Sequence, residues 1–117
     1  MNRQTIHTDG APAAIGTYSQ GVKVGNLVFI SGQIPFDPTT MEVVAGDFKA
    51  RARQVFDNLK AIAEASGGSL NDAVKLTIFL TDLDSFAEVN EVMAEYCDEP
   101  YPCLLYTSDA ADERVRV

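Results

Sequence analysis

The hydrophobic pattern of the chain changes within one stretch, FKARARQVFDNLKAIAEASGGSLNDAVKLTIFLTD, residues 48–82. Its first part predicts a helix over 48–66, with apolar side chains at helical spacing on one face: Ala52, Val55, Leu59, Ile62 and Ala63. Gly67 and Gly68 then end the helix, because glycine adopts the left-handed conformation that follows a helix at little cost. The last part alternates as a strand with one apolar face: Val74, Leu76, Ile78 and Leu80. A helix followed by such a strand is typical of a helix packed on a sheet.

The residues before this helix predict a β-meander. VKV (22–24) and LVFISG (27–32) are short β-rich runs, and Gly25-Asn26 between them is a hairpin-type turn. After two prolines and a pair of threonines, a third short strand is expected at residues 42–45. The first third of the chain is therefore expected to supply strands only.

The residues after the alternating strand predict a second helix and a final strand. The helix begins at DSFAEVN (84–90), where Ser85 and Glu88 have the spacing of a capping box. CLLYT (103–107) has strand character and is expected to return to the sheet. The order β-β-β-α-β-α-β predicts one α+β domain with two helices on one face of a mixed sheet.

Composition and charge describe a small globular protein that does not bind nucleic acid. The 117 residues are 46% hydrophobic and 22% charged, which suits one compact domain. The formal net charge of -8 repels phosphate backbones. No apolar run in the sequence reaches the ~20 residues that cross a bilayer, and the first residues lack the apolar core of a secretory signal. With only two cysteines, these features predict a cytoplasmic protein without a membrane partner.

Three places carry residue types that packing alone does not explain, and each has two interpretations. Tyr18 follows AAIGT in a glycine-flanked loop, where its hydroxyl meets a ligand or its ring shields a sheet edge. Ser31 and Gly32 end an apolar strand, as a plain strand end or as a rim that a small ligand approaches closely because glycine has no Cβ. Asn90 lies at the edge of the second helix's apolar stripe, so its amide is expected to latch a loop or contact a ligand.

The other reactive side chains indicate no catalytic or metal centre. His7, the only histidine, lies near the N-terminus and is expected on the surface. Cys97, at a helix end, is expected to be a small buried hydrophobic residue and not a nucleophile. The sequence contains no zinc, P-loop or dinucleotide motif, and its acidic residues are scattered. The residues by themselves predict a small acidic domain without a cofactor.

Four segments occur together in a specific order. They are APAAIGTYSQGVKVGNLVFISGQIPFDPTT, ARQVFDNLKAI, VKLTIFLTDLDSFAEVNEV and EYCDEPYP, within residues 6–102. In this combination the chain resembles the RidA/YjgF family, the reactive-intermediate deaminases. The resemblance implies a fold like that of chorismate mutase and a homotrimer whose subunits form a barrel, with ligand clefts between neighbours. It also implies hydrolysis of 2-imino acids or their enamine tautomers (2-aminoacrylate, 2-iminobutanoate) to 2-keto acids and ammonia, without metal or cofactor.

The resemblance assigns substrate-binding residues as well. Tyr18 matches the tyrosine of a G-x-Y loop that faces the ligand. Ser31 and Gly32 match an SGQ rim that lines the cleft, and Asn90 matches a helix asparagine placed near the site. A small imine, enamine or keto acid is therefore the expected partner.

The similarity stops after Pro102, so the chain is expected to consist of a RidA-like domain at 1–102 and a divergent tail at 103–117. In the deaminating branch an arginine grips the substrate carboxylate through a bidentate pair, and Leu104 stands in its place. Leucine cannot make that contact. The family's later strand, with a Glu-x-Glu-Ala stretch, has no match in SDAADERVRV.

The tail has two explanations. The chain is a natural family member that lacks the arginine, or its end is non-native and comes from a frameshift or read-through. The abrupt break in similarity favours the second explanation. By descent the chain is predicted to be an imine deaminase, and as written to be weak or inactive. The alternative is a non-catalytic trimeric module that binds a small metabolite. Loss of the later strand would expose a sheet edge, which predicts poor trimerisation, with monomer or aggregate in light scattering. Ribonuclease activity fits poorly with the acidic composition.

Overall fold

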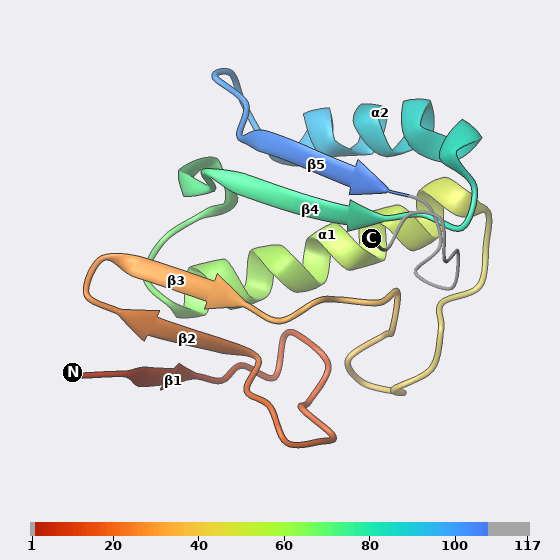
Figure 1. The fold of residues 1–117 in the computed structure, drawn as a ribbon. Coiled ribbons are helices and arrows are strands. Elements are labelled where there is room, and N and C mark those ends of the chain that lie inside the picture. The colour runs from red at the N-terminus through yellow and green to blue at the C-terminus, as the bar shows by residue number, and fades with distance from the viewer. Residues whose placement is uncertain (1, 108–117) are drawn as a thin grey trace. The chain divides into compact units, whose positions relative to one another are not determined.

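The computed structural model describes residues 2–107, which belong to two compact units, Met1–Leu70 and Asn71–Val117. The first unit holds three strands and helix α1, and the second holds two strands and helix α2 (Figure 1). Two short 3₁₀ helices, η1 (Leu70–Asp72) and η2 (Leu83–Ser85), lie in the connections. The strands and helices confirm the α+β class, although one of the three strands before α1 is not among those predicted.

The three strands of the first unit form an antiparallel sheet in the order β1-β2-β3. β1 (Gln4–Ile6) pairs with β2 (Gly21–Val24), which pairs in turn with β3 (Leu27–Ile30). Gly25 has a φ of 59°, and with Asn26 it makes the two-residue connection between β2 and β3. The predicted hairpin is confirmed.

Helix α1 (Phe48–Ala65) confirms the predicted helix to within one residue. Asp47 caps its N-terminus, because the Asp47 Oδ1 atom accepts a hydrogen bond of 2.9 Å from a backbone N–H of the first turn. At the other end Gly67 has a φ of 95°, and the Gly68 N–H donates to the Ala63 carbonyl at 3.1 Å. This is the 6→1 bond of a Schellman motif, so the glycine pair ends the helix as predicted.

Helix α1 packs on the sheet through Ile62, which is fully buried. Ile62 forms a buried cluster with Ile6 of β1 and Ala11, and Ile30 of β3 packs against it. A Cβ on Gly21 would lie 3.1 Å from the Ile62 side chain, so this glycine lets β2 approach the helix closely. The cluster fixes the ends of β1 and β3, from which the chain leaves the sheet toward the candidate site.

The third strand expected at residues 42–45 does not form. Phe36 and Val43 make only an isolated antiparallel bridge, and the residues between them form a turn. Strand β1, by contrast, is not evident from the sequence. Its three residues include a single buried side chain, Ile6, which is too short a pattern to show alternation.

The second unit contains a parallel pair of strands, β4 (Lys75–Phe79) and β5 (Cys103–Thr107). They pair in a register that sets Leu76 beside Leu104. CLLYT therefore returns to a sheet, as predicted. The described strands thus combine antiparallel and parallel pairing, in two separately hydrogen-bonded sheets. The remainder of the predicted divergent tail, residues 108–117, lies outside the described residues.

Helix α2 (Phe86–Tyr96) is shorter than α1 and begins differently from the prediction. Ser85 precedes it, but the Ser85 side chain makes no capping hydrogen bond, so the predicted capping box with Glu88 is wrong. The turn before the helix is held instead by Asp82, whose Oδ1 atom accepts from the Asp84 N–H at 2.9 Å. An Asx-type turn has therefore taken the place of the serine cap.

Candidate functional site

A small hollow opens in the first unit, with a volume of about 60 Å³. It lies between the segment 12–20, which leads into β2, and the segment 32–41, which leaves β3. Tyr18 and Gly32 both line it, so the structure brings these two predicted site residues together. Most of the described lining residues are apolar and none is charged. The hollow therefore suits a small alkyl group, with polar groups at a few places only.

The Tyr18 side chain is half exposed and reaches the hollow from the loop before β2. Its hydroxyl oxygen accepts a long hydrogen bond of 3.4 Å from the Ile15 N–H. Such a bond is weak, and the hydroxyl proton is not committed to another described residue. Tyr18 is therefore free to donate to or accept from a ligand, and its role in binding stays a prediction.

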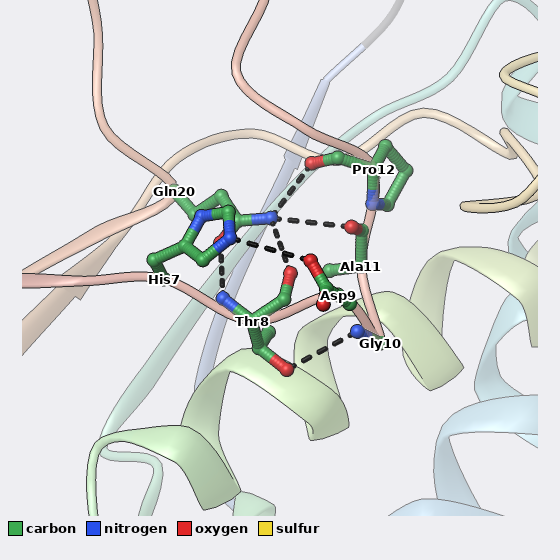
Figure 2. A network of polar contacts seen from close by, with 7 residues as sticks. All are labelled: His7, Thr8, Asp9, Gly10, Ala11, Pro12 and Gln20. Carbon is green, nitrogen blue, oxygen red and sulfur yellow. Dashed lines mark hydrogen bonds and ion pairs between the residues drawn. The ribbon is translucent and has the colours of Figure 1, made fainter.

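Gln20 anchors the loop that carries Tyr18 (Figure 2). Its side chain is only 3% exposed. The Nε2 atom donates to the carbonyl oxygens of Thr8, Ala11 and Pro12 at 3.0, 3.2 and 2.8 Å. The Oε1 atom accepts from the Thr8 N–H at 2.7 Å. One buried amide thus holds the main chain of residues 8–12, a role that sequence reasoning missed.

Ser31 fastens the end of β3 to the same loop. The Ser31 hydroxyl donates a short hydrogen bond to the Ser19 carbonyl, and the Ser31 N–H donates to the Gln20 carbonyl at 3.0 Å. The hydroxyl proton is therefore engaged within the protein, and only the oxygen lone pairs are left for a ligand. The adjacent Gly32 is exposed, and a Cβ there would meet nothing within 4 Å. Its backbone is open to close approach.

The wall formed by the segment 34–36 is held by Asn58 of α1. The Asn58 side chain is fully buried, and its Nδ2 atom donates to the carbonyls of Ile34 and Phe36 at 3.3 and 3.1 Å. Its Oδ1 atom accepts from Gln54 Nε2 at 2.9 Å. Two buried amides, Gln20 and Asn58, therefore fix the two segments between which the hollow lies.

Asn90 belongs to the second unit and is exposed on α2. Its side-chain amide latches no loop among the described residues, so the expectation of a structural latch is not met. Its contact with a ligand stays a prediction.

Leu104 is half-buried in β5, where it lies beside Leu76. Tyr106 is two residues further along and on the same face, and its ring stacks on that of Phe86 with centroids 4.1 Å apart. Leu105 points to the opposite face and is 52% exposed. Leu104 thus belongs to an apolar face that meets the start of α2.

The two cysteines are free thiols in opposite surroundings. Cys97 is buried, and burial, with a smaller effect of the Asp98 carboxylate, raises the pKa of its thiol above the ordinary value of 9.0. The thiol is therefore protonated at neutral pH, where a nucleophile would need to be a thiolate. This confirms Cys97 as a buried hydrophobic residue.

A thiol reagent such as Ellman's reagent should therefore label Cys103 quickly in the native chain and Cys97 only on unfolding. Cys103 is exposed, whereas Cys97 is both covered and protonated. The pKa of the Cys97 thiol is higher in the folded chain than in the unfolded chain. The thiol therefore makes its full contribution to the free energy of unfolding below the pKa of the unfolded chain, and this contribution is lost as the pH rises through the pKa of the folded chain. Rapid labelling of the native Cys103→Ala variant would contradict this assignment.

His7 lies on the surface, as predicted, and its Nε2 atom is 3.4 Å from Oδ1 of Asp9, which is also exposed. Within residues 2–107, no group of three or more His, Cys, Asp and Glu side chains could hold a metal ion. No helix in the same part of the chain is long and apolar enough to cross a bilayer.

The chain is thus of the α+β class and has a small hollow, lined by Tyr18 and Gly32, whose described lining carries no charged side chain. The model of the family described as Endoribonuclease L-PSP matches residues 8–111. The chain therefore belongs to this family, the RidA/YjgF family, and the predicted resemblance is confirmed.

Individual relatives agree with this assignment. A RutC family protein of Pyrococcus horikoshii is 54% identical over 100 residues, covering 86% of this chain and 79% of that protein. The 2-iminobutanoate/2-iminopropanoate deaminase of Escherichia coli K12 is 52% identical over 96 residues, covering 82% and 74%. The crystal structure of RidA from an Antarctic Psychrobacter species is 62% identical with a TM-score of 0.87, covering 92% and 87%.

Proposed function

We propose that this chain is an imine/enamine deaminase of the RidA type. The observation that carries the proposal is the small uncharged hollow lined by Tyr18 and Gly32, in a chain whose relatives include named 2-iminobutanoate/2-iminopropanoate deaminases. Water adds to the C=N carbon of a 2-imino acid, and the tetrahedral adduct expels ammonia to leave a 2-keto acid. The step consumes one water and transfers no electrons, so no redox cofactor is needed.

In this scheme the chain's own groups bind and orient the substrate. The hollow takes the alkyl side chain, because its described lining is mostly apolar. The Tyr18 hydroxyl is placed to hydrogen-bond the imine nitrogen or the attacking water, and Gly32 allows close approach to the main chain. Ser31 accepts through its oxygen, since its proton is engaged. Asn90, on α2 of the second unit, stays a predicted ligand contact by resemblance alone.

The substrate carboxylate lacks its partner in this scheme. The described lining of the hollow carries no charge, and the resemblance assigns the carboxylate-binding arginine to residue 104, which is leucine. A carboxylate transferred from water to a site without a cation is strongly disfavoured. We therefore infer that the chain as written turns over 2-imino acids weakly or not at all.

Although the divergent tail predicts poor trimerisation, we further propose that the protein acts as a homotrimer, a barrel with helices on its outside and ligand clefts between neighbouring subunits. Strand β3 carries two large apolar side chains that are mostly exposed in the single chain, Leu27 at 59% and Phe29 at 63%. An assembly of this kind would bury such a surface. The two free thiols suit the reducing cytoplasm, where we place the protein.

The competing function is a non-catalytic trimeric module that holds a small metabolite in the mostly apolar hollow, which does not require an arginine at residue 104. Two measurements on the same sample separate the two functions: the thermal midpoint with added 2-ketobutyrate, and ammonia release from 2-iminobutanoate. Stabilisation without hydrolysis, both in the unmodified chain and after Leu104→Arg, supports the binding module, whereas hydrolysis above the uncatalysed rate in either chain supports the deaminase. If neither stabilisation nor hydrolysis is observed, both proposed functions are contradicted.

The family description also names a ribonuclease activity, which the chemistry of this chain does not favour. The net charge of -8 opposes binding of a phosphate backbone. The single histidine, His7, is exposed near the N-terminus and contacts only Asp9 among the side chains described.

A further inference from the structure

Met41 is the only residue other than glycine, among those the structure describes, that has a positive φ, 59°. A side chain is crowded against the backbone in this left-handed region, so a residue other than glycine, asparagine or aspartate is held there only under constraint. The Met41 side chain is half-buried and lines the hollow. A strained residue at a candidate site is a reason to ask what its side chain does.

The constraint comes from the turn that Asp37 organises. The Asp37 Oδ1 atom accepts from the N–H groups of Thr39 and Thr40 at 2.7 and 3.3 Å. The Met41 N–H donates to the Asp37 carbonyl at 2.8 Å. The Asp37 N–H donates to the Glu42 carbonyl at 2.9 Å. These bonds surround Met41 on both sides, so its backbone cannot relax without breaking the turn.

The turn is also tied to the core of the first unit. Asn58 donates to the carbonyl of Phe36, immediately before the turn, and the Val44 N–H donates to the Pro35 carbonyl at 2.9 Å just after it. The position of the Met41 side chain in the hollow is therefore set by a chain of hydrogen bonds that reaches helix α1. The Met41 side chain can change its rotamer, but the backbone cannot shift to move this side chain out of the hollow.

We propose that Met41 sets the largest alkyl group that the hollow accepts, and so selects 2-imino acids with short side chains. This inference rests on the proposed function of the same hollow. A cavity of about 150 Å³ holds benzene, whereas the hollow, with Met41 in place, has about 60 Å³. That volume admits a methyl or ethyl group. Truncation of the Met41 side chain leaves more room in the hollow for the alkyl side chain of the ligand.

The test compares three variants: Met41→Gly, Met41→Ala and Met41→Leu. Dissociation constants of 2-ketobutyrate and 2-ketohexanoate are measured by NMR titration in chains that also carry Leu104→Arg, so that the carboxylate of both probes has a partner. The first two variants should shift the preference toward the longer acid by about tenfold, as expected for burial of two more methylene groups. Met41→Leu keeps the volume and should keep the original preference. Met41→Gly should melt a few degrees higher than Met41→Ala, because only glycine relieves the left-handed strain.

An unchanged preference in both small-residue variants, or no keto acid binding in any form, overturns the inference. Ammonia release from 2-iminobutanoate is measured separately on the unmodified chain and tests the proposed function. Turnover together with an unchanged preference refutes the role of Met41 and leaves the deaminase standing. A shifted preference without turnover supports the role of Met41 and assigns the hollow to a binding module.

Discussion

Replacement of Leu104 by arginine is expected to raise kcat/KM for 2-iminobutanoate by about 100- to 4000-fold. An unpaired buried charge costs about 3–5 kcal/mol, and each 1.4 kcal/mol is about a factor of ten. Leu104 is half-buried in β5. A guanidinium at this place can extend along apolar surface and present its planar pair of donors to a carboxylate. The measurement is formation of 2-ketobutyrate from imine generated by threonine dehydratase.

Two matched variants make the Leu104 experiment specific. Leu105→Arg adds the same charge to the neighbouring residue on the opposite, exposed face of β5 and should leave the rate unchanged. Leu104→Lys supplies the charge without the planar fork and should recover only part of the gain. Equal acceleration by Leu104→Arg and Leu105→Arg would show that net charge matters and that residue 104 has no special place.

Replacement of Gln20 by glutamate is expected to lower the free energy of unfolding by about 3–5 kcal/mol, as for a buried charge without a partner. The substitution preserves shape but removes the donor that serves three carbonyl oxygens, at 2.8–3.2 Å. The new carboxylate would face these carbonyls in a place that is 3% exposed. Urea denaturation measures the loss, which should shrink in acid, where a protonated carboxyl group can donate again.

Gln4→Glu is the control for the Gln20 experiment, because Gln4 is exposed on β1 and should tolerate the charge within about 0.5 kcal/mol. A Gln20→Glu chain as stable as the Gln4→Glu chain would mean that the network in Figure 2 does not hold the loop. Hydrogen exchange of the Thr8 amide gives a second readout, since this N–H donates to Gln20.

The periodic parts of the fold could be predicted from the sequence. Helix α1 follows from an apolar stripe of several turns with two glycines after it, and β5 follows from the run CLLYT. The strand expected at 42–45 fails because the Asp37 turn satisfies the backbone locally and leaves only the Phe36–Val43 bridge. Short segments without a repeated pattern are decided by such local hydrogen bonds.

The side-chain amides show more clearly what the spacing of apolar residues cannot predict. Asn58 and Asn90 are both placed between apolar residues at helical spacing. Asn58 is fully buried and binds the segment 34–36, whereas Asn90 is exposed. The difference lies in what packs against each helix face, which spacing alone does not contain. Gln20 gives even less warning, because a single loop glutamine has no pattern, and its partners at residues 8–12 become evident only from the folded loop.

The most direct test of the central claim is the rate of 2-ketobutyrate formation from enzymatically generated 2-iminobutanoate, with and without the unmodified 117-residue chain. The claim is that this is a RidA-type hollow without the cation that its substrate carboxylate needs. It predicts a rate within about twofold of uncatalysed hydrolysis, because a substrate whose carboxylate has no partner is not held in the hollow. Acceleration of about tenfold or more would contradict the claim and show that another group of the protein binds the carboxylate.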